Sequence, residues 1–428
     1  MTMVLHFPDS RVRARAANLD SGAQTCSKAS GGRQEMRRAM GSVEEMSGAE
    51  GANPVFEIGR SGALVLDAIR RGGSVARSDL TERTPLSQQS VHRLAEDLLE
   101  KGFLRLEAPK IAGRGKPSPR LALSPDGAYG IGIAVDTEEV RVAVTNIVGD
   151  ILHLVILDVE PNDPERVRDE AAERVPEIVA GLKLDRRRIA GVGISMQGYR
   201  RTRSLAFVPP PKIAAWRDRD VGEIFSGAFG LPLMAENNAT LGAEAENWVG
   251  AGLRFDNFAY LSINLGFGGG VVINGAPYLG YHMNAAEISS IYTPEEQERR
   301  PALRTLIAML REAGRDIGSV NALKRHYDPS WPEIDRWIER VTPALDQMLR
   351  AMTGILDPAA IVFGGEAPRD LRVRLARASS PRTVDEINLP FPGPELLISE
   401  IETDPNVLGA ALLPIRKRLF SATPGIHT

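Results

Sequence analysis

The chain has 428 residues, which is long for one ordinary domain and predicts roughly two or three domains. Its 43% hydrophobic and 25% charged residues are typical of a globular protein with buried cores. No run approaches ~18 uninterrupted apolar residues, and the N-terminal sequence has no long apolar segment. We therefore expect neither a transmembrane helix nor a secretory signal. The only cysteine, Cys26, excludes an internal disulfide and a thiolate-rich metal site, which is typical of a reducing cytoplasm.

The charge of the chain is unevenly distributed, although the net charge is only −3. Residues 55–120 contain 12 Lys and Arg against 8 Asp and Glu, whereas residues 121–428 contain 33 against 41. A basic segment therefore precedes an acidic body. This asymmetry predicts an anionic partner for the basic segment.

Residues 1–54 are rich in Ala, Ser, Gly and Arg and have no hydrophobic periodicity. Such a composition predicts a disordered tail. Met36, Met40 and Met46 leave the position of the true start codon open.

Residues 55–124 contain the elements of a winged helix-turn-helix. GALVLDAIRRGG and SVARSDLTERT predict two short helices. A third helix is predicted from an N-cap at Ser87 to a terminating glycine at Gly102. FLRLE and RLALSP then predict two strands joined by a loop. Helix, helix, turn, helix and hairpin is the element order of a winged helix-turn-helix, which indicates DNA as the anionic partner.

The third helix has a polar face suited to reading DNA. Gln pairs bidentately with adenine and Arg with guanine, Ser hydroxyls reach phosphates, and Arg in a flexible wing lies well in a narrow minor groove. The residues predicted to bind DNA are Ser87, Gln88, Gln89, Ser90, His92 and Arg93 in the helix and Arg114 and Lys116 in the wing. The alternative is a solvated helix face and a solvated loop without a partner.

From residue 126 strands and helices alternate. Strands are predicted over 127–136, 140–150 and 151–160, and a helix over 164–182. A buried strand over 189–198, a helix over 221–230, a strand over 231–237 and a helix over 239–250 follow, and then a second, similar unit begins. We therefore predict an α/β protein with the two lobes of an actin-like ATPase (ribonuclease H-like) fold and a ligand cleft between them. Lobe 1 comprises residues 125–245 and a C-terminal helix over 404–420, and lobe 2 comprises residues 246–403.

An ordered set of motifs points to a known family. LSQQSVHRLAEDLLEKGFL is followed in order by WRDRD, AENNAT, GFGGGVVING, NAAEIS, LDPAAIVFGGE and VLGAALL. Over residues 58–420 this series resembles the ROK family (repressors, open reading frames, kinases), in particular its transcriptional-repressor branch. Any one of these motifs is a weak signal, whereas the ordered set is specific.

The resemblance also implies which parts of kinase chemistry the chain lacks. Residues 136–139 read Asp-Thr-Glu-Glu where family kinases carry a glycine-rich phosphate turn, and two carboxylates there repel ATP. Residues 263–266 lack the threonine of the second phosphate loop, and Asn238 replaces the carboxylate that acts as general base. Ser290 replaces the histidine of the family's zinc site. We therefore expect no enzyme activity, no cofactor and no metal.

Three polar residues match positions that hold sugar hydroxyls in the family. They are Asn237, Asn238 and Glu287. An amide donates and accepts hydrogen bonds, and a carboxylate accepts two hydroxyls, so the set is suited to binding a polyol without transforming it. The alternative is that these residues are relics that only stabilise the hinge between the lobes.

The sequence thus predicts a cytoplasmic transcriptional regulator, specifically a repressor of sugar-utilisation genes. Its expected partners are operator DNA, a sugar or sugar derivative, and a second copy of the chain, as a homodimer or within a tetramer. No membrane partner is expected. Two alternatives remain at this point: an ATP-dependent sugar kinase, and a constitutive DNA-binding dimer with a vestigial ligand site.

Overall fold

The computed structural model describes residues 54–108, 119–201, 203–380 and 392–420. Several predictions fall outside this range and are not addressed by the structure. These are the N-terminal tail up to residue 53, Cys26, and the wing residues Arg114 and Lys116. Among the described residues, no helix is long and apolar enough to cross a membrane.

The N-terminal domain is a winged helix. Its helices are α2 (Arg60–Gly72), α3 (Arg77–Arg83) and α4 (Gln88–Glu100), preceded by the 3-10 turn η1 (Pro54–Phe56). A three-stranded sheet in the order β1-β3-β2 contains β1 (Ser74–Ala76), β3 (Arg120–Leu123) and β2 (Leu104–Glu107). The buried core of the domain includes Leu66, Ile69, Leu80, Val91 and Leu98. The apolar faces of the three helices therefore pack together, as their periodicity predicts.

The ends of α4 confirm the local signals in the sequence. The Ser87 hydroxyl oxygen accepts a hydrogen bond from the Ser90 amide at 3.2 Å and caps the helix N-terminus. At the other end, Gly102 has a φ of 75° and donates to the Leu99 carbonyl, while Phe103 donates to the Leu98 carbonyl. These two bonds form the glycine-terminated motif that ends many helices.

The second predicted helix is wrong in its first three residues. Residues 74–76 form β1, which pairs antiparallel with β3, and α3 begins only at Arg77. Gly73, with a φ of 68°, turns the chain after α2, and Val75 then pairs with Leu121 inside the domain core. Pairing with a strand distant in sequence overrides the local helix signal.

The first five-stranded sheet has the order β10-β7-β4-β5-β6. Its strands are β4 (Tyr129–Val135), β5 (Val140–Asn146), β6 (Ile151–Leu157), β7 (Ile189–Met196) and β10 (Leu233–Asn237). Strand β4 is antiparallel to β5 and parallel to β7, and β5 and β6 are antiparallel. Helix α5 (Pro164–Gly181) packs against β5 and β6. The helix predicted over 221–230 is shorter than expected, because α6 (Val221–Ile224) ends before Gly227 and Gly230, both of which have positive φ.

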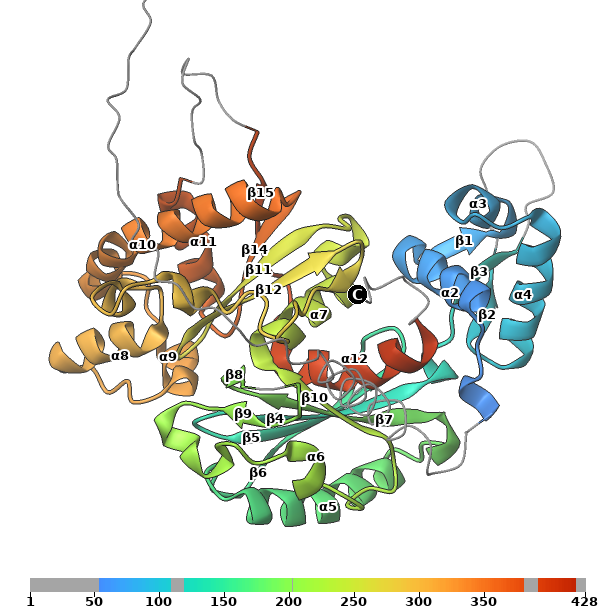
Figure 1. Ribbon diagram of the computed structural model, residues 1–428, viewed down its shortest axis with the longest axis horizontal. Coiled ribbons are helices and arrows are strands. Elements are labelled where there is room, and N and C mark those ends of the chain that lie inside the picture. The colour runs from blue at the N-terminus through green and yellow to red at the C-terminus, as the bar shows by residue number, and fades with distance from the viewer. Residues whose placement is uncertain (1–53, 109–118, 202, 381–391, 421–428) are drawn as a thin grey trace, which may run out of the picture. The chain divides into compact units, whose positions relative to one another are not determined.

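The second five-stranded sheet repeats the same topology in the order β13-β12-β11-β14-β15. Its strands are β11 (Phe258–Ile263), β12 (Phe267–Ile273), β13 (Ala276–Pro277), β14 (Ala360–Gly364) and β15 (Glu395–Ile398), accompanied by helices α8 (Leu303–Glu312), α9 (Val320–His326), α10 (Pro332–Leu356) and α11 (Arg369–Ala378). In each sheet two antiparallel neighbours lie on one side of the first strand and two parallel strands on the other. This duplication confirms the predicted actin-like fold (Figure 1).

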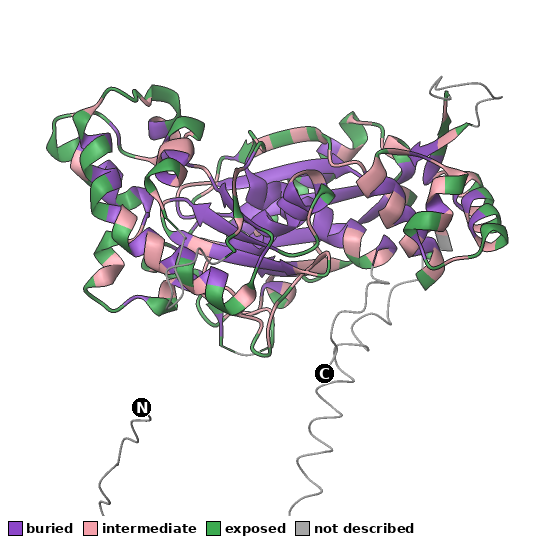
Figure 2. Cartoon of the chain, turned by 90° about the horizontal axis from the view of Figure 1, so that it is seen from above, coloured by how far each residue is buried: buried purple, intermediate pink, exposed green. Residues whose placement is uncertain are grey.

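Short elements connect these parts. They are the two-stranded ribbon of β8 (Tyr199–Arg200) and β9 (Phe207–Val208) and the 3-10 turns η2 (Pro125–Gly127), η3 (Arg186–Arg188), η4 (Pro211–Trp216), η5 (Ala251–Leu253), η6 (Ile288–Ile291) and η7 (Glu296–Arg299). The strands of both large sheets are largely buried, whereas the helices carry exposed outer faces (Figure 2).

Helices α7 (Asn238–Val249) and α12 (Pro405–Leu419) pack side by side and contact different sheets. Helix α12 lies on β4 and β7, where a Cβ on Gly130, Gly132 or Gly193 would collide with its backbone. Helix α7 lies on β12, where a Cβ on Gly270 would meet Ala243 and the Ala239 carbonyl. Gly268 and Gly270 of β12 therefore permit close packing of α7. The predicted lobe boundary after residue 245 falls inside α7.

Candidate functional site

The polar face of α4 is accessible. Gln88, Gln89, His92 and Arg93 are all exposed, while Val91, Ala95 and Leu98 on the opposite face are buried. Within the described residues, no hydrogen bond or ion pair engages the side chains of Gln88, Gln89 or Arg93. The hydroxyls of Ser87 and Ser90 lie 2.9 Å apart and are hydrogen-bonded to each other. The helix thus presents unengaged amide and guanidinium groups to solvent.

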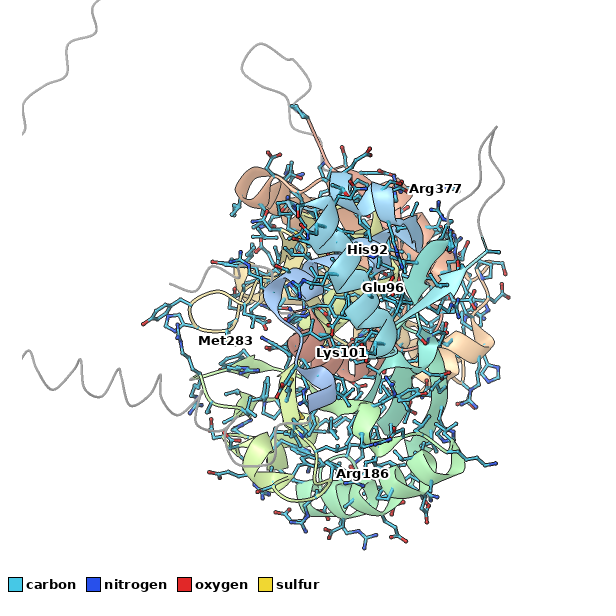
Figure 3. The ribbon with its side chains drawn as sticks, turned by 90° about the vertical axis from the view of Figure 1, so that its right-hand side faces the viewer. His92, Glu96, Lys101, Arg186, Met283 and Arg377 are labelled. Carbon is cyan, nitrogen blue, oxygen red and sulfur yellow. The ribbon has the colours of Figure 1, made fainter. Side chains whose placement is uncertain are left out.

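Farther along the same helix, His92 and Glu96 have a common partner. The guanidinium of Arg77, at the start of α3, lies 3.1 Å from Nδ1 of His92 and forms an ion pair with Glu96. His92 and Glu96 lie on the exposed side of α4, and Lys101 follows at its end (Figure 3). Arg77 was not among the residues predicted from the sequence. Its approach to α4 depends on how α3 and α4 pack, which the sequence does not specify.

The turn at the start of α7 contains the first two predicted ligand residues. The Asn237 side-chain oxygen accepts from the amides of Ala239 and Thr240 at 2.8 and 3.2 Å, and its nitrogen donates to the Gly198 carbonyl at 2.7 Å. Asn237 is therefore the N-cap of α7 and fixes the position of β8. Its polar atoms are already engaged within the chain, which disfavours the predicted contact with a ligand.

Asn238 and Glu287 keep polar groups available. The oxygen of Asn238 lies near the Ala239 amide, and no hydrogen bond within the described residues engages its side-chain nitrogen. Glu287 is partly buried, and burial raises the pKa of its carboxyl, an effect opposed by the positive charge of Arg300. The Ser290 hydroxyl, which the sequence places where the family carries a zinc-binding histidine, is expected to bind no metal and donates to the Glu287 carbonyl at 2.7 Å. Among the described residues, no group of three or more potential ligands is arranged to hold a metal ion.

The segment before Glu287 is tied to the other lobe next to Asn237. The side chain of Asn284 accepts from the Arg200 amide at 2.7 Å and donates to the Arg200 carbonyl at 2.6 Å. Arg200 is itself buried against Glu236, with a nitrogen-to-oxygen distance of 3.2 Å. Strand β8 therefore lies between the turn of Asn237 and the loop that leads to Glu287.

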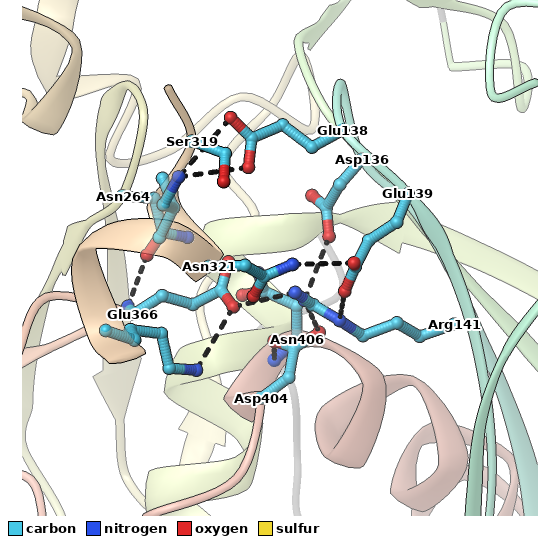
Figure 4. A network of polar contacts seen from close by, with 12 residues as sticks. Asp136, Glu138, Glu139, Arg141, Asn264, Ser319, Asn321, Glu366, Asp404 and Asn406 are labelled. Carbon is cyan, nitrogen blue, oxygen red and sulfur yellow. Dashed lines mark hydrogen bonds and ion pairs between the residues drawn. The ribbon is translucent and has the colours of Figure 1, made fainter. Parts of the chain in front are cut away.

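The acidic stretch in the position of the kinase phosphate turn forms a buried network around Arg141 (Figure 4). The Arg141 guanidinium contacts Asp136 at 3.5 Å, Glu366 at 2.9 Å, Asp404 at 2.7 Å, and also Glu139. Burial raises the pKa of Asp136, and the nearby negative charges of Asp404 and Glu366 raise it further. The network therefore contains more carboxylates than cations, and its side chains around Arg141 are largely buried.

The same stretch joins the two lobes. The Glu138 carboxylate accepts from the Val320 amide at 3.1 Å, and the Glu139 carboxylate accepts from the Asn321 side chain at 2.6 Å. The sequence predicted that these carboxylates repel phosphate. The structure adds that both carboxylates are engaged by α9.

The winged helix contacts the end of α7 through a buried arginine. Arg70 in α2 donates to the Asn247 and Trp248 carbonyls, each at 2.9 Å, and its guanidinium lies 4.9 Å from the centroid of the Trp248 ring. The Asp67 carboxylate also forms an ion pair with the Arg70 guanidinium, at 2.8 Å. Helix α7 therefore begins at the Asn238 turn and ends in contact with α2, the first helix of the winged domain.

Comparison with known proteins agrees with this architecture. Residues 130–300 match the model of the ROK family, and residues 58–115 match the model of the MarR family. These matches make the part behind the winged helix similar to the ROK family and the N-terminal part similar to the MarR family. Among solved structures, a ROK family transcriptional regulator described as a homolog of the E. coli MLC protein has a TM-score of 0.60 at 19% identity, covering 87% of this chain and 98% of that one. At this identity the likeness concerns the fold alone.

Similar sequences include proteins of two functional classes. The xylose repressor of Bacillus subtilis is 26% identical over 51% of this chain and 56% of its own length. The beta-glucoside kinase of Listeria innocua is 26% identical over 44% of this chain and 69% of its own. An uncharacterized protein of Sinorhizobium fredii, y4fQ, is 28% identical over 83% of this chain and 91% of its own. The chain thus spans little more than half the length of the xylose repressor it matches.

Proposed function

We propose that the protein is a transcriptional regulator, a repressor of sugar-utilisation genes, that binds operator DNA through α4 and responds to a sugar or sugar derivative. The observation that carries this proposal is the exposed polar face of α4, whose Gln88, Gln89 and Arg93 are unengaged within the described residues. Side chains of these types read adenine and guanine in the major groove. The similarity to xylose repressors supports the same function.

A two-fold operator requires two winged helices, so we propose that the protein acts as a homodimer in the cytoplasm, where the operator lies. The ligand would bind to the Asn238 amide and the Glu287 carboxylate. Helix α7 offers a route between the two functions, because it begins at Asn238 and its last carbonyls are held by Arg70. Coupling further requires that the ligand bind the two states of the protein with different affinity.

We also propose that the protein has no kinase activity. Asn238 cannot accept a proton at neutral pH, and Glu138 and Glu139 bind α9 in the position of the phosphate turn. The similarity to beta-glucoside kinases makes an ATP-dependent sugar kinase the second candidate. ATP consumption in the presence of sugars distinguishes the two candidates.

Operator footprinting with the purified chain tests the DNA-binding part. The Arg93→Ala variant should bind the footprinted site about 10- to 100-fold more weakly, because one bidentate base contact contributes about 1–3 kcal/mol. Arg254→Ala is the matched control, since Arg254 is an exposed arginine that forms an ion pair with Glu395 in the ROK domain. Equal affinity of the wild type and Arg93→Ala for the operator would contradict the assignment of α4.

Thermal melting with a panel of sugars tests the ligand part. A ligand that binds only the folded protein raises its stability by RT ln(1 + [L]/Kd), so the melting temperature should rise with the right sugar. Asn238→Ala should reduce this shift without changing the affinity for DNA. If no sugar shifts the melting temperature, the constitutive DNA-binding dimer is the better description.

A further inference from the structure

The exposed tyrosines of the described residues lie on two segments close in sequence to contacts of the turn that contains Asn237 and Asn238. One segment begins after Gly198, which bonds to Asn237, and the other precedes Asn284, which bonds to Arg200. The large apolar side chains with high exposure include three tyrosines, Tyr199 at 44%, Tyr278 at 45% and Tyr281 at 65%, and within the described residues no Phe or Trp. Tyr199 directly follows Gly198, whose carbonyl accepts from Asn237. Tyr281 lies three residues before Asn284, which clamps Arg200. We call Tyr199 and Tyr281 the aromatic rim.

Tyr281 is held in place although it is exposed. The Arg203 guanidinium lies 4.7 Å from the centroid of its ring, and Arg203 Nε donates to the Tyr281 carbonyl at 3.2 Å. The His282 ring contacts it edge-on at a centroid distance of 4.8 Å. A fixed aromatic ring has already lost much of its conformational freedom, so a ligand that stacks on it meets a smaller entropic cost.

The backbone of the same loop adopts a costly conformation. Met283 has a φ of 60° and Ala286 has a φ of 62°, in the left-handed region that residues with a side chain seldom occupy. Such conformations cluster at ligand-binding segments, where the surrounding structure determines the backbone. Met283 lies on the outer part of this loop (Figure 3), and Ala286 directly precedes Glu287. The loop therefore has a left-handed residue near each feature. Met283 follows Tyr281 of the aromatic rim by two residues, and Ala286 directly precedes Glu287.

We propose that the effector is a glycoside with at least two rings, and this inference rests on the proposed function. The first ring is a sugar whose hydroxyls bind Asn238 and Glu287. The second ring, a further sugar or an aryl group, stacks on Tyr281 and is flanked by Tyr199. Both kinds of second ring present a flat apolar face, which is the chemistry that an exposed aromatic ring recognises.

Calorimetric titration of the full chain tests the rim with three sets of probes. These are methyl glycosides, the corresponding disaccharides and the corresponding 4-nitrophenyl glycosides of glucose, galactose, xylose, mannose and N-acetylglucosamine. We expect a two-ring probe to bind at least tenfold more tightly than the methyl glycoside of the same first sugar. Whether the disaccharide or the aryl glycoside binds more tightly identifies the nature of the second ring.

Substitutions of Tyr281 test whether its ring provides the additional affinity for the two-ring probes. Tyr281→Ala should weaken binding of the two-ring probe about 2- to 10-fold, the range expected for loss of one aromatic stacking contact, and should leave methyl glycoside binding unchanged. Tyr281→Phe keeps the ring and should bind like the wild type. Ile355→Ala is the matched control, because Ile355 is a 77% exposed apolar residue outside the rim.

The outcomes separate this inference from the proposed function. If methyl glycosides bind as tightly as two-ring probes, or if Tyr281→Ala weakens both equally, the rim inference is wrong while the sugar-responsive regulator stands. If no probe binds to the wild type, the proposed sugar response fails, and the rim inference fails with it. Loss of binding in Ile355→Ala would also overturn the assignment to Tyr281.

Discussion

Asp136 lies among several carboxylates, which Arg141 and, at Glu366, Lys324 balance only in part. A carboxyl of this kind holds its proton more tightly in the folded chain than in the unfolded chain, because burial and the charges of Asp404 and Glu366 raise its pKa to about 8. Folding therefore takes up a proton between about pH 4 and pH 8. The favourable contribution is complete at low pH and is lost as the pH rises through the folded pKa.

We therefore predict that Asp136→Asn reduces the pH dependence of stability. The wild type should lose unfolding free energy between pH 5 and pH 8 with a slope of at most about 1.4 kcal/mol per pH unit from this group. The variant should show a smaller loss and should be more stable than the wild type above pH 8. Urea denaturation at each pH measures this. Asp169→Asn, on the exposed surface of α5, controls for the loss of one carboxylate, and parallel curves for wild type and Asp136→Asn would contradict the prediction.

Whether the sequence predicted a residue's role depended on how far away its partners lie. Ser87 and Gly102 were correctly placed because a helix cap involves neighbouring residues. Asn237 carries a similar local signal, an asparagine directly before a helix, which could have identified it as an N-cap. The partners of Arg141 come from residues 136, 139, 366 and 404, and only the folded arrangement of both lobes brings them together.

At the scale of elements, helices α2 and α7 form a junction that depends on Arg70. Its guanidinium satisfies two carbonyls at the end of α7 and stacks on Trp248, and its side chain is only 4% exposed. Adjacent Arg71 forms ion pairs with Asp67, at 3.0 Å, and with Asp256, whose side chain is 63% exposed. Arg70 should therefore contribute more to the stability of the junction than Arg71, since exposed ion pairs contribute little.

Arg70→Met should weaken this junction by about 3 kcal/mol, because two charge-assisted hydrogen bonds are lost while the aliphatic volume is kept. We expect faster hydrogen exchange in α2 and unchanged exchange in β4 and β11. Arg71→Met is the matched control and should cost less than about 1 kcal/mol. Similar effects of the two substitutions on α2 exchange would count against a special role for Arg70.

Elements with a strong local period were predicted well, and those fixed by distant pairing were not. The predicted strands β4, β5 and β6 are all present, because alternating or continuous apolar residues between turns identify them. Strand β1 was assigned to a helix because its pairing with β3 is not visible locally. Helices α8, α9 and α11 of the second lobe were not predicted, although the apolar residues of α8 recur at helical spacing.

At the scale of the molecule, the two lobes have the topology of an actin-like fold and are joined by hydrogen bonds from α9 to the carboxylates of Glu138 and Glu139. Restoring one catalytic group should therefore not restore catalysis. Asn238→Asp replaces the missing carboxylate, yet Glu138 and Glu139 still bind α9 in the position of the phosphate turn. We predict no sugar-dependent ADP formation by either the wild type or Asn238→Asp in a coupled assay across the sugar panel. Turnover by the wild type would establish a kinase, and turnover by Asn238→Asp alone would show that this turn still admits ATP.

The position of α12 has a consequence for the synthesis of the chain. Gly130, Gly132 and Gly193 meet the backbone of this helix, so one face of the first large sheet is completed only by residues 405–419. The strands of that sheet leave the ribosome long before their covering helix does. This face of the sheet stays uncovered until residues 405–419 have been synthesised. A nonsense mutation that removes residues 405–419 would therefore leave a face of the first large sheet uncovered, although the strands of that sheet are intact.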